Sequence, residues 1–250
     1  MKLEEIVNFL DEFLKIKEWE DRSMNGLQVE GKNQVGRIAF AVDACIETFR
    51  EAKKANADML VVHHGIIWGG INSVRGLVMR RLKFLLENEI SLYAAHLPLD
   101  AHPEVGNNAE LLRIVGARIE KPFGIYHGKE IGYSGILSKS KKLEDIKKIL
   151  DLKLGVDSRV LKFGKDRVKK IAAVSGGGAF AVPEAGEKGI ELFITGEAEH
   201  NAYHAANESS LNVIFAGHYT TETLGVRALM RILAERFDVE VEFIDVPTSL

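Results

Sequence analysis

Two adjacent histidines, His63 and His64, directly follow an apolar run over residues 59–62. A neutral imidazole offers one ring nitrogen to a cation, so two neighbouring rings beyond an apolar strand are typical of a metal site. The alternative is structural, with one histidine in the core and the other capping an element or lying on the surface. Two later segments of the chain favour the metal site.

The first of these segments is a short apolar run over residues 90–95, which is followed by His96 and then by Asp100. Ligand sites in open α/β sheets lie beyond the carboxyl ends of the strands. We therefore expect these two side chains to lie near the adjacent histidines. A histidine and a carboxylate at one strand end would extend the set of metal donors.

The second segment is the apolar run over residues 211–216, which leads into His218 and Glu222. Residues four apart lie on one face of a helix, so a helix that begins near residues 220–221 would aim both side chains at one site. Such a pair is common by chance, and its weight comes from the two other strand ends.

Together the three strand ends provide three imidazoles and two carboxylates as predicted metal ligands: His63, His64, Asp100, His218 and Glu222. These donors suffice for two divalent ions if one carboxylate bridges. Iron, manganese, zinc, nickel and cobalt all accept mixed imidazole and carboxylate ligation. The single cysteine, Cys45, excludes both an intrachain disulfide and a structural zinc site of the thiolate type.

Three further residues are predicted to move protons at the site. His96 shares a strand end with a predicted ligand, which favours an acid–base role. Glu197, His200 and His204 have helical spacing, and we expect Glu197 and His204 to be proton carriers or to orient ligands. The alternative for both is a position away from the site.

Two more segments have an open interpretation. The glycine-rich residues 175–178 could approach a phosphate through their backbone N–H groups, or they could form a tight turn. Asp43, at the end of a predicted strand, could cap the next helix or orient a ligand histidine.

The apolar pattern alternates between helical and strand periods over much of the chain. We expect helices over 2–15, 46–55, 77–88, 107–115 and from about 220 to 237, and strands over 37–42, 59–63, 90–95 and 212–216. This βαβ order favours a largely parallel sheet. Near residues 121–124 the pattern breaks, and shorter strands are expected at 130–137, 159–163 and 170–174. The sequence thus predicts an α/β fold of two lobes, residues 1–125 with 206–250 and a smaller lobe of residues 126–205.

The motifs resemble those of the Ngg-interacting-factor-three-like family, whose members often carry the label GTP cyclohydrolase 1 type 2 homolog. The resemblance covers nearly the whole chain and is closest to the short prokaryotic branch. It rests on residues 25–29, 62–65 with Trp68, 95–100, 106–108, 195–197, and 217–218 with Glu222.

This resemblance implies two lobes, each a sheet flanked by helices, with a dinuclear metal centre at the lobe interface and assembly into a homohexamer. By the same analogy, His64 and Asp100 would hold one ion. His63 and His218 would hold the other, with Glu222 bridging the two. The reaction that the family label implies is opening of the imidazole ring of GTP.

The net charge of −3 conceals a basic segment. Residues 139–170 contain twelve Lys or Arg against five Asp or Glu, a local charge of +7 that leaves −10 for the rest of the chain. Such a segment could bind nucleic acid or nucleotide phosphates. The alternative is a solvated helix face of mixed charge.

These observations predict a dinuclear metal-dependent hydrolase of a nucleotide-like substrate, and the residues leave ring opening and phosphoester hydrolysis both open. The alternative is a metal-bearing oligomer without turnover, either a nucleic-acid-binding (DNA-binding) protein or a metallochaperone. With 46% hydrophobic residues and no apolar stretch of about 20 residues, we expect no membrane span and a cytoplasmic protein.

Overall fold

The computed structural model describes residues 1–249, which divide into two compact units. Unit 1 consists of Met1–Leu99 and Val226–Val246, and unit 2 of Asp100–Gly225 with the residues from Pro247 onward. Each unit is a β-sheet flanked by helices, so the predicted α/β class is confirmed.

The sheet of unit 1 has five strands, and four of them run parallel. In spatial order they are β1 (Gly26–Val29), β4 (Ser91–Ala94), β3 (Met59–His64), β2 (Arg37–Asp43) and β11 (Glu240–Phe243). Only β1, at one edge, is antiparallel to its neighbour. The central strands are buried along nearly their whole length, because helices cover a parallel sheet on both faces. This burial explains their continuous apolar sequences.

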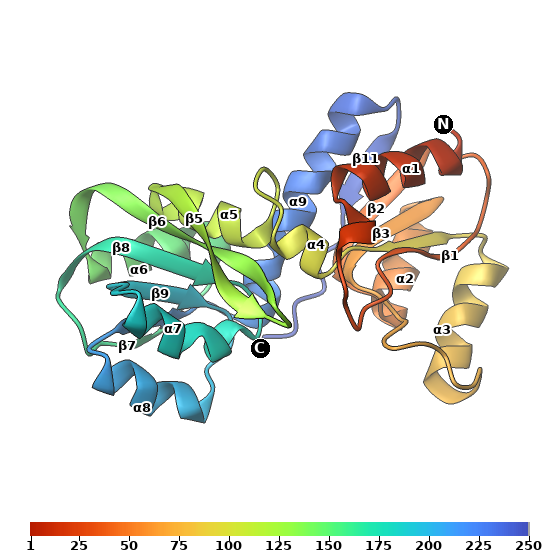
Figure 1. The fold of residues 1–250 in the computed structure, drawn as a ribbon. Coiled ribbons are helices and arrows are strands. Elements are labelled where there is room, and N and C mark those ends of the chain that lie inside the picture. Colours follow the sequence, from red (N-terminus) through yellow and green to blue (C-terminus); the bar gives the residue numbers. More distant parts are fainter. Residues whose placement is uncertain (250) are drawn as a thin grey trace. The chain divides into compact units, whose positions relative to one another are not determined.

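Helices cover both faces of this sheet (Figure 1). Unit 1 contains α1 (Leu3–Phe13), the short η1 (Ile16–Glu18), α2 (Ile46–Lys54) and α3 (Gly76–Glu87). Figure 1 shows α1 on one side of the strands and α2 and α3 on the other. On that second side, Phe49 of α2 and Leu85 of α3 are fully buried in one apolar cluster with residues of β2, β3 and β4.

The sheet of unit 2 has six strands and is mixed. Their spatial order is β5 (Ala117–Tyr126), β6 (Lys129–Lys142), β8 (Arg167–Val174), β9 (Leu192–Thr195), β10 (Asn212–Phe215) and β7 (Arg159–Leu161). Strands β8, β9 and β10 are parallel, whereas β5 and β6 form a long antiparallel hairpin. That hairpin is the physical basis of the break in the βαβ pattern near residue 121.

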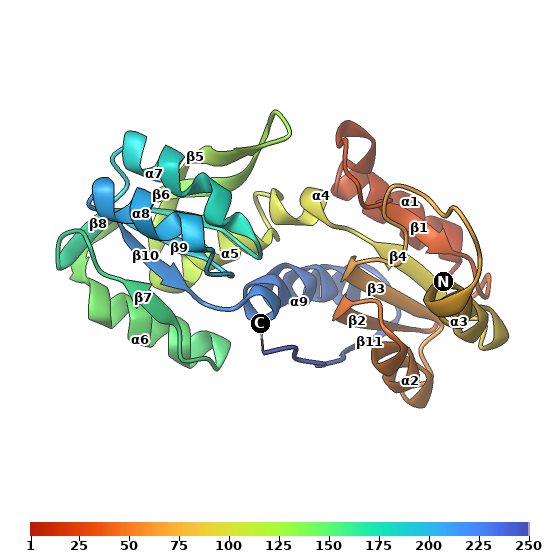
Figure 2. The same ribbon diagram turned by 90° about the horizontal axis from the view of Figure 1, so that it is seen from below.

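Helices also lie on both faces of this second sheet (Figures 1 and 2). One face carries α5 (Asn107–Val115) and α6 (Leu143–Leu154), and the other carries η2 (Gly178–Ala181), α7 (Val182–Glu187) and α8 (His200–Glu208). Gly116 and Gly155 end α5 and α6 in the left-handed conformation, with φ of 78° and 70°, which a residue without a Cβ adopts at little cost.

The division into units differs from the lobes expected from sequence. Residues 100–125 and 206–225 lie in unit 2, which makes it the larger of the two. The reason is strand pairing: β5 pairs with β6, and β10 pairs with β9, so both flanking segments complete the second sheet rather than the first. The expected helices and strands themselves are present, with ends shifted by a few residues.

Two of the three boundaries between the units lie within helices. The short α4 (Leu97–Asp100) ends on the first residue of unit 2, and the long α9 (His218–Arg236) begins in unit 2 and ends in unit 1. Within residues 1–249, no helix combines the length and the apolar character that crossing a bilayer demands.

Candidate metal centre

Three imidazoles gather in unit 1. One ring nitrogen of each of His63, His64 and His96 lies within 4.8 Å of the others. The ring centroids of the two adjacent histidines are 4.7 Å apart, and His96 lies 5.1 Å from His63. Because β3 and β4 are parallel neighbours, the residues that end them meet at one edge of the sheet.

The ring orientation of the adjacent histidines is fixed by acceptors at Nδ1. Nδ1 of the buried His63 lies 2.9 Å from the carbonyl oxygen of Ala95, and Nδ1 of His64 lies 2.8 Å from Oδ1 of Asp43. A carbonyl or carboxylate oxygen only accepts, so Nδ1 carries the hydrogen and Nε2 keeps the lone pair. Of the two interpretations of Asp43, the structure supports the orienting role.

If His64 binds metal, Asp43→Asn is expected to weaken that binding about 10- to 100-fold without unfolding the chain, because the His64 ring loses its charged anchor. Competition with a chromogenic chelator measures the dissociation constant. Asp238→Asn, an exposed aspartate beyond α9, is the matched control and should bind metal as the wild type does. Equal affinity of the two variants would argue against an orienting role for Asp43.

His96 is held by two residues of an N-terminal loop. Its Nδ1 lies 2.9 Å from Oδ2 of Asp21, and its backbone N–H donates to Oδ1 of Asn25 at 2.7 Å. Burial would raise the pKa of Asp21, but the hydrogen bond and charge of His96, with bonds from Asn25 and the Ser23 N–H, lower that pKa to about 2. Asp21 thus stays ionised and leaves Nε2 of His96 as the reactive nitrogen. Sequence reasoning missed Asp21, which no strand or helix pattern marks.

A second donor group lies in unit 2, at the start of α9. His218 and Glu222 occupy one face of the helix, with Nε2 3.1 Å from Oε1, so the predicted spacing is confirmed. The helix begins at His218, two residues earlier than expected. Glu197 accepts from Nδ1 of His218 at 2.6 Å. Burial lowers the pKa of His218, but the hydrogen bonds and charges of Glu222 and Glu197 outweigh it and raise that pKa to about 9.

Asp100 joins this group through a buried hydrogen-bond network. Its Oδ1 accepts from Nδ2 of Asn107 at 2.8 Å and from Oγ of Ser175 at 2.9 Å. A carboxylate oxygen of Asp100 also lies within 4.8 Å of one of Glu222. Both carboxylates are at most 5% exposed. Two buried carboxylates this close repel each other unless a cation or a proton lies with them.

The glycine-rich loop lies directly against the same group. Gly176 has φ of +55°, and a Cβ added there would lie 2.1 Å from Oε1 of Glu222. Its N–H donates to Oγ1 of Thr221 at 3.0 Å, and its carbonyl accepts from the N–H of Glu197 at 2.9 Å. The loop therefore positions Glu197 and passes Glu222 where only glycine leaves enough room.

His204 lies in a different setting. Helix α8 begins at His200, after Glu197, so the single helical face expected for these residues does not form. His204 is exposed, and its ring packs 6.2 Å from that of His200 and 5.4 Å from that of Tyr203. Of the residues predicted on this segment, the structure brings Glu197 to His218.

Several basic residues of segment 139–170 have local partners. Lys141 donates to the Val115 carbonyl at the end of α5, and Lys147 pairs with Asp151 and Asp157 at 2.5 and 2.7 Å. Lys162 pairs with Asp166 at 3.0 Å. These contacts favour the solvated-face interpretation of the segment.

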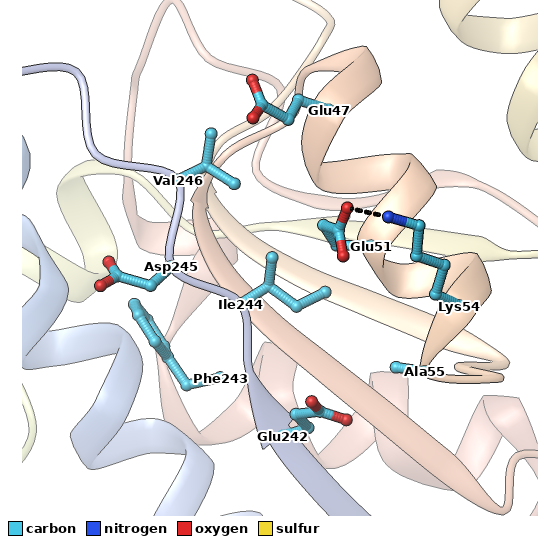
Figure 3. Close-up of a pocket in the computed structure, with 9 residues that line it drawn as sticks. All are labelled: Glu47, Glu51, Lys54, Ala55, Glu242, Phe243, Ile244, Asp245 and Val246. Atoms are coloured by element: carbon cyan, nitrogen blue, oxygen red, sulfur yellow. Dashed lines mark hydrogen bonds and ion pairs between the residues drawn. The ribbon is translucent and has the colours of Figure 1, made fainter.

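Unit 1 also contains an acidic pocket of about 470 Å³ between α2 and the residues that follow β11 (Figure 3). Glu47, Glu51, Glu242 and Asp245 line it, and Glu51 pairs with Lys54 at 2.6 Å. It contains none of the histidines described above. Its carboxylates therefore serve as controls for the metal centre.

The chemistry of the two donor groups fits divalent cations. Three histidines direct Nδ1 to an acceptor and so keep the Nε2 lone pair: His63, His64 and His96. His218 also directs Nδ1 to an acceptor, but its Nε2 faces Glu222, where a cation would replace the proton between the two side chains. His102 shows the contrast, since its Nδ1 accepts backbone N–H groups of Glu104 and Val105 at 3.3 Å. Nitrogen donors with two buried carboxylates are typical of zinc, iron and related metals.

Comparison with known proteins gives consistent results. The family model Duf34/NIF3 (NGG1p interacting factor 3) matches residues 1–249. A GTP cyclohydrolase 1 type 2 homolog of Archaeoglobus fulgidus is 56% identical over 250 residues, covering 100% of both chains. A solved structure from Thermus thermophilus is 40% identical with a TM-score of 0.92, and it covers 100% of both chains. Reduced HcgD from Methanocaldococcus jannaschii is 27% identical with a TM-score of 0.85, covering 98% of each.

Proposed function

The chain belongs to the Duf34/NIF3 family, and from this premise we propose that it is a metal-dependent hydrolase of a nucleotide-like substrate. The observation that carries the proposal is the shared orientation of four histidines, each anchored at Nδ1 by an acceptor oxygen. Side chains held in this way are preorganised to offer Nε2 to a cation or, at His96, to a proton. The name of the Archaeoglobus fulgidus relative makes GTP the first substrate to test.

We propose two divalent cations per chain, with His63, His64, Asp100, His218 and Glu222 as their ligands. When bound, such a cation polarises the substrate and lowers the pKa of water to about 7. A homohexamer and a cytoplasmic location stay predictions from sequence.

The chain's own residues then have distinct tasks. Asp43 and Glu197 keep Nδ1 of His64 and His218 protonated, so that both rings present Nε2. His96 can accept a proton at Nε2, because the ionised Asp21 at its Nδ1 stabilises the imidazolium that forms. Glu197 is in this proposal a positioning residue, and a proton-carrying role for His204 stays a prediction.

The test is metal-dependent turnover. Metal-free protein is reconstituted separately with iron(II), manganese, zinc, nickel or cobalt, and bound metal is counted before GTP is added. In opening of the guanine imidazole ring, one water adds at C8 and the C8–N9 bond breaks, which leaves C8 as a formamide, and a second water releases it as formate. The loss of guanine absorbance reports the first step, and formate reports the second. Phosphate release reports phosphoester hydrolysis in the same samples.

We expect two ions per chain and turnover of GTP that disappears when a chelator removes the metal. His96→Gln should then lower kcat at least about 100-fold while metal content is kept, since general acid–base groups contribute about 10²–10⁴. Two bound ions without turnover of GTP by either reaction would overturn the hydrolase proposal.

A further inference from the structure

An exposed indole lies at the rim of the three-histidine group in unit 1. Trp68 is 40% exposed, yet its ring centroid lies 5.0 Å from that of His96 and 6.0 Å from that of His64. Its Nε1–H donates to the carbonyl oxygen of Gly65 at 3.0 Å. The polar group of the indole is thus satisfied within the protein, while much of its apolar surface remains open to solvent.

The backbone around this indole is fixed on both sides. Trp68 forms an antiparallel bridge with Ser23, and the Met24 N–H donates to the Ile67 carbonyl at 3.0 Å. Oε1 of Gln28 accepts from the Ile66 N–H at 2.8 Å. The indole is therefore held in place before any ligand arrives, which removes much of the ordering cost of binding.

The surroundings of the indole are open and apolar. Gly69 and Gly70 follow it in the left-handed region, and no atom lies within 4 Å of the position that a Cβ would take at either. Two more apolar side chains are exposed on the bridged segments that hold Trp68: Met24 is 47% exposed and Ile71 is 39% exposed. Exposed apolar side chains beside a cluster of polar donors are typical of a ligand site.

We propose that Trp68 is the stacking platform for the base of the substrate, an inference that rests on the proposed function. A nucleobase offers a flat π face that an indole binds whatever its hydrogen-bonding edge. Since Nε1–H is already committed to Gly65, the platform recognises the face of the base and not its edge pattern. It therefore distinguishes nucleotides from sugar phosphates, which lack a base. It discriminates only weakly between one purine and another.

The chain allows a direct optical test, because Trp19 and Trp68 are its only tryptophans. In metal-loaded Trp19→Phe protein, the tryptophan emission comes from Trp68 alone. GMP and AMP should quench this emission saturably and with similar dissociation constants. Ribose 5-phosphate, which keeps the phosphate and lacks the base, should leave the emission unchanged.

Calorimetry with GMP measures the contribution of the indole. Trp68→Leu should weaken binding about 5- to 100-fold, the range expected for the loss of one base stack, with metal content unchanged. Trp68→Phe should recover part of the loss because it retains an aromatic face. Tyr126→Leu, which removes an exposed aromatic side chain of unit 2, is the matched control and should bind GMP as the wild type does.

Three results would overturn the inference: GMP affinity unchanged in Trp68→Leu, quenching by ribose 5-phosphate equal to that by GMP, or emission that depends on protein concentration without ligand. The last result would assign the indole to a contact between copies of the chain. Failure of the proposed function looks different, since base-dependent quenching without turnover would retain the platform and discard the hydrolase. Turnover with an unchanged KM in Trp68→Leu would retain the hydrolase and discard the stacking platform.

Discussion

Glu222→Gln is expected to reduce the bound metal from two ions per chain to one or none. The side chain is 3% exposed, pairs with Nε2 of His218 at 3.1 Å and has an oxygen within 4.8 Å of one of Asp100. A glutamine fills the same space, but its neutral amide cannot bridge two cations as a carboxylate does. Elemental analysis after exhaustive dialysis counts the ions, and the dissociation constant should rise by roughly 100-fold or more.

The matched control is Glu51→Gln, in the acidic pocket of unit 1 (Figure 3). It removes the same charge from a carboxylate that pairs with Lys54 and not with a histidine. The control should retain two ions, and both variants should keep the far-ultraviolet circular dichroism of the wild type. Two ions in Glu222→Gln would exclude this carboxylate as a bridge and would overturn the dinuclear assignment.

The strand ends that carry the histidines could be predicted from the sequence. Residues 59–62, 90–95 and 211–216 are apolar runs, and β3, β4 and β10 form there. Burial on both faces requires such runs in the central strands of a parallel sheet, so the pattern and the position of His63 at a carboxyl end follow together.

The residues that orient the histidines could not be found in this way. Asp21 lies 75 residues before His96, in a loop without apolar periodicity, and only the folded chain brings the two together. Ser175 likewise reaches Asp100 across 75 residues. Hydrogen-bond partners set by long-range packing leave no local signal, whereas Asp43 could be anticipated because it ends a strand next to β3.

Two sequence arguments failed because the local period was extrapolated too far. Helical spacing joined Glu197 to His204, but α8 begins only at His200, and Glu197 lies in the loop before it. The lobe boundary expected at residue 125 marked the change from βαβ units to a hairpin, which lies inside unit 2. In both cases the sequence pattern described the local structure. The path of the loop decided where Glu197 lies, and strand pairing decided which unit the hairpin joins.

Asn107→Ala is expected to destabilise the metal-free protein by about 2–4 kcal/mol, because it breaks two buried hydrogen bonds at once. Asn107 is fully buried, donates to Oδ1 of Asp100 at 2.8 Å and accepts from the N–H of Gly225 at 2.6 Å. With alanine at this position, the Gly225 N–H loses its acceptor and the Asp100 carboxylate loses one donor. Thermal unfolding followed by circular dichroism should show the melting temperature falling by about 5–15 °C.

The same substitution should also weaken metal binding, because Oδ1 of Asp100 loses the amide of Asn107, which holds it together with the Ser175 hydroxyl. Loss of a partner that orients a ligand costs about 10- to 100-fold in affinity, so the stability defect and the metal defect should appear together. Asn201→Ala, at an exposed position of α8, should shift the free energy of unfolding by no more than about 0.5 kcal/mol. A lower melting temperature with unchanged metal affinity would show that Asn107 stabilises the packing of α9 and does not orient Asp100 for metal binding.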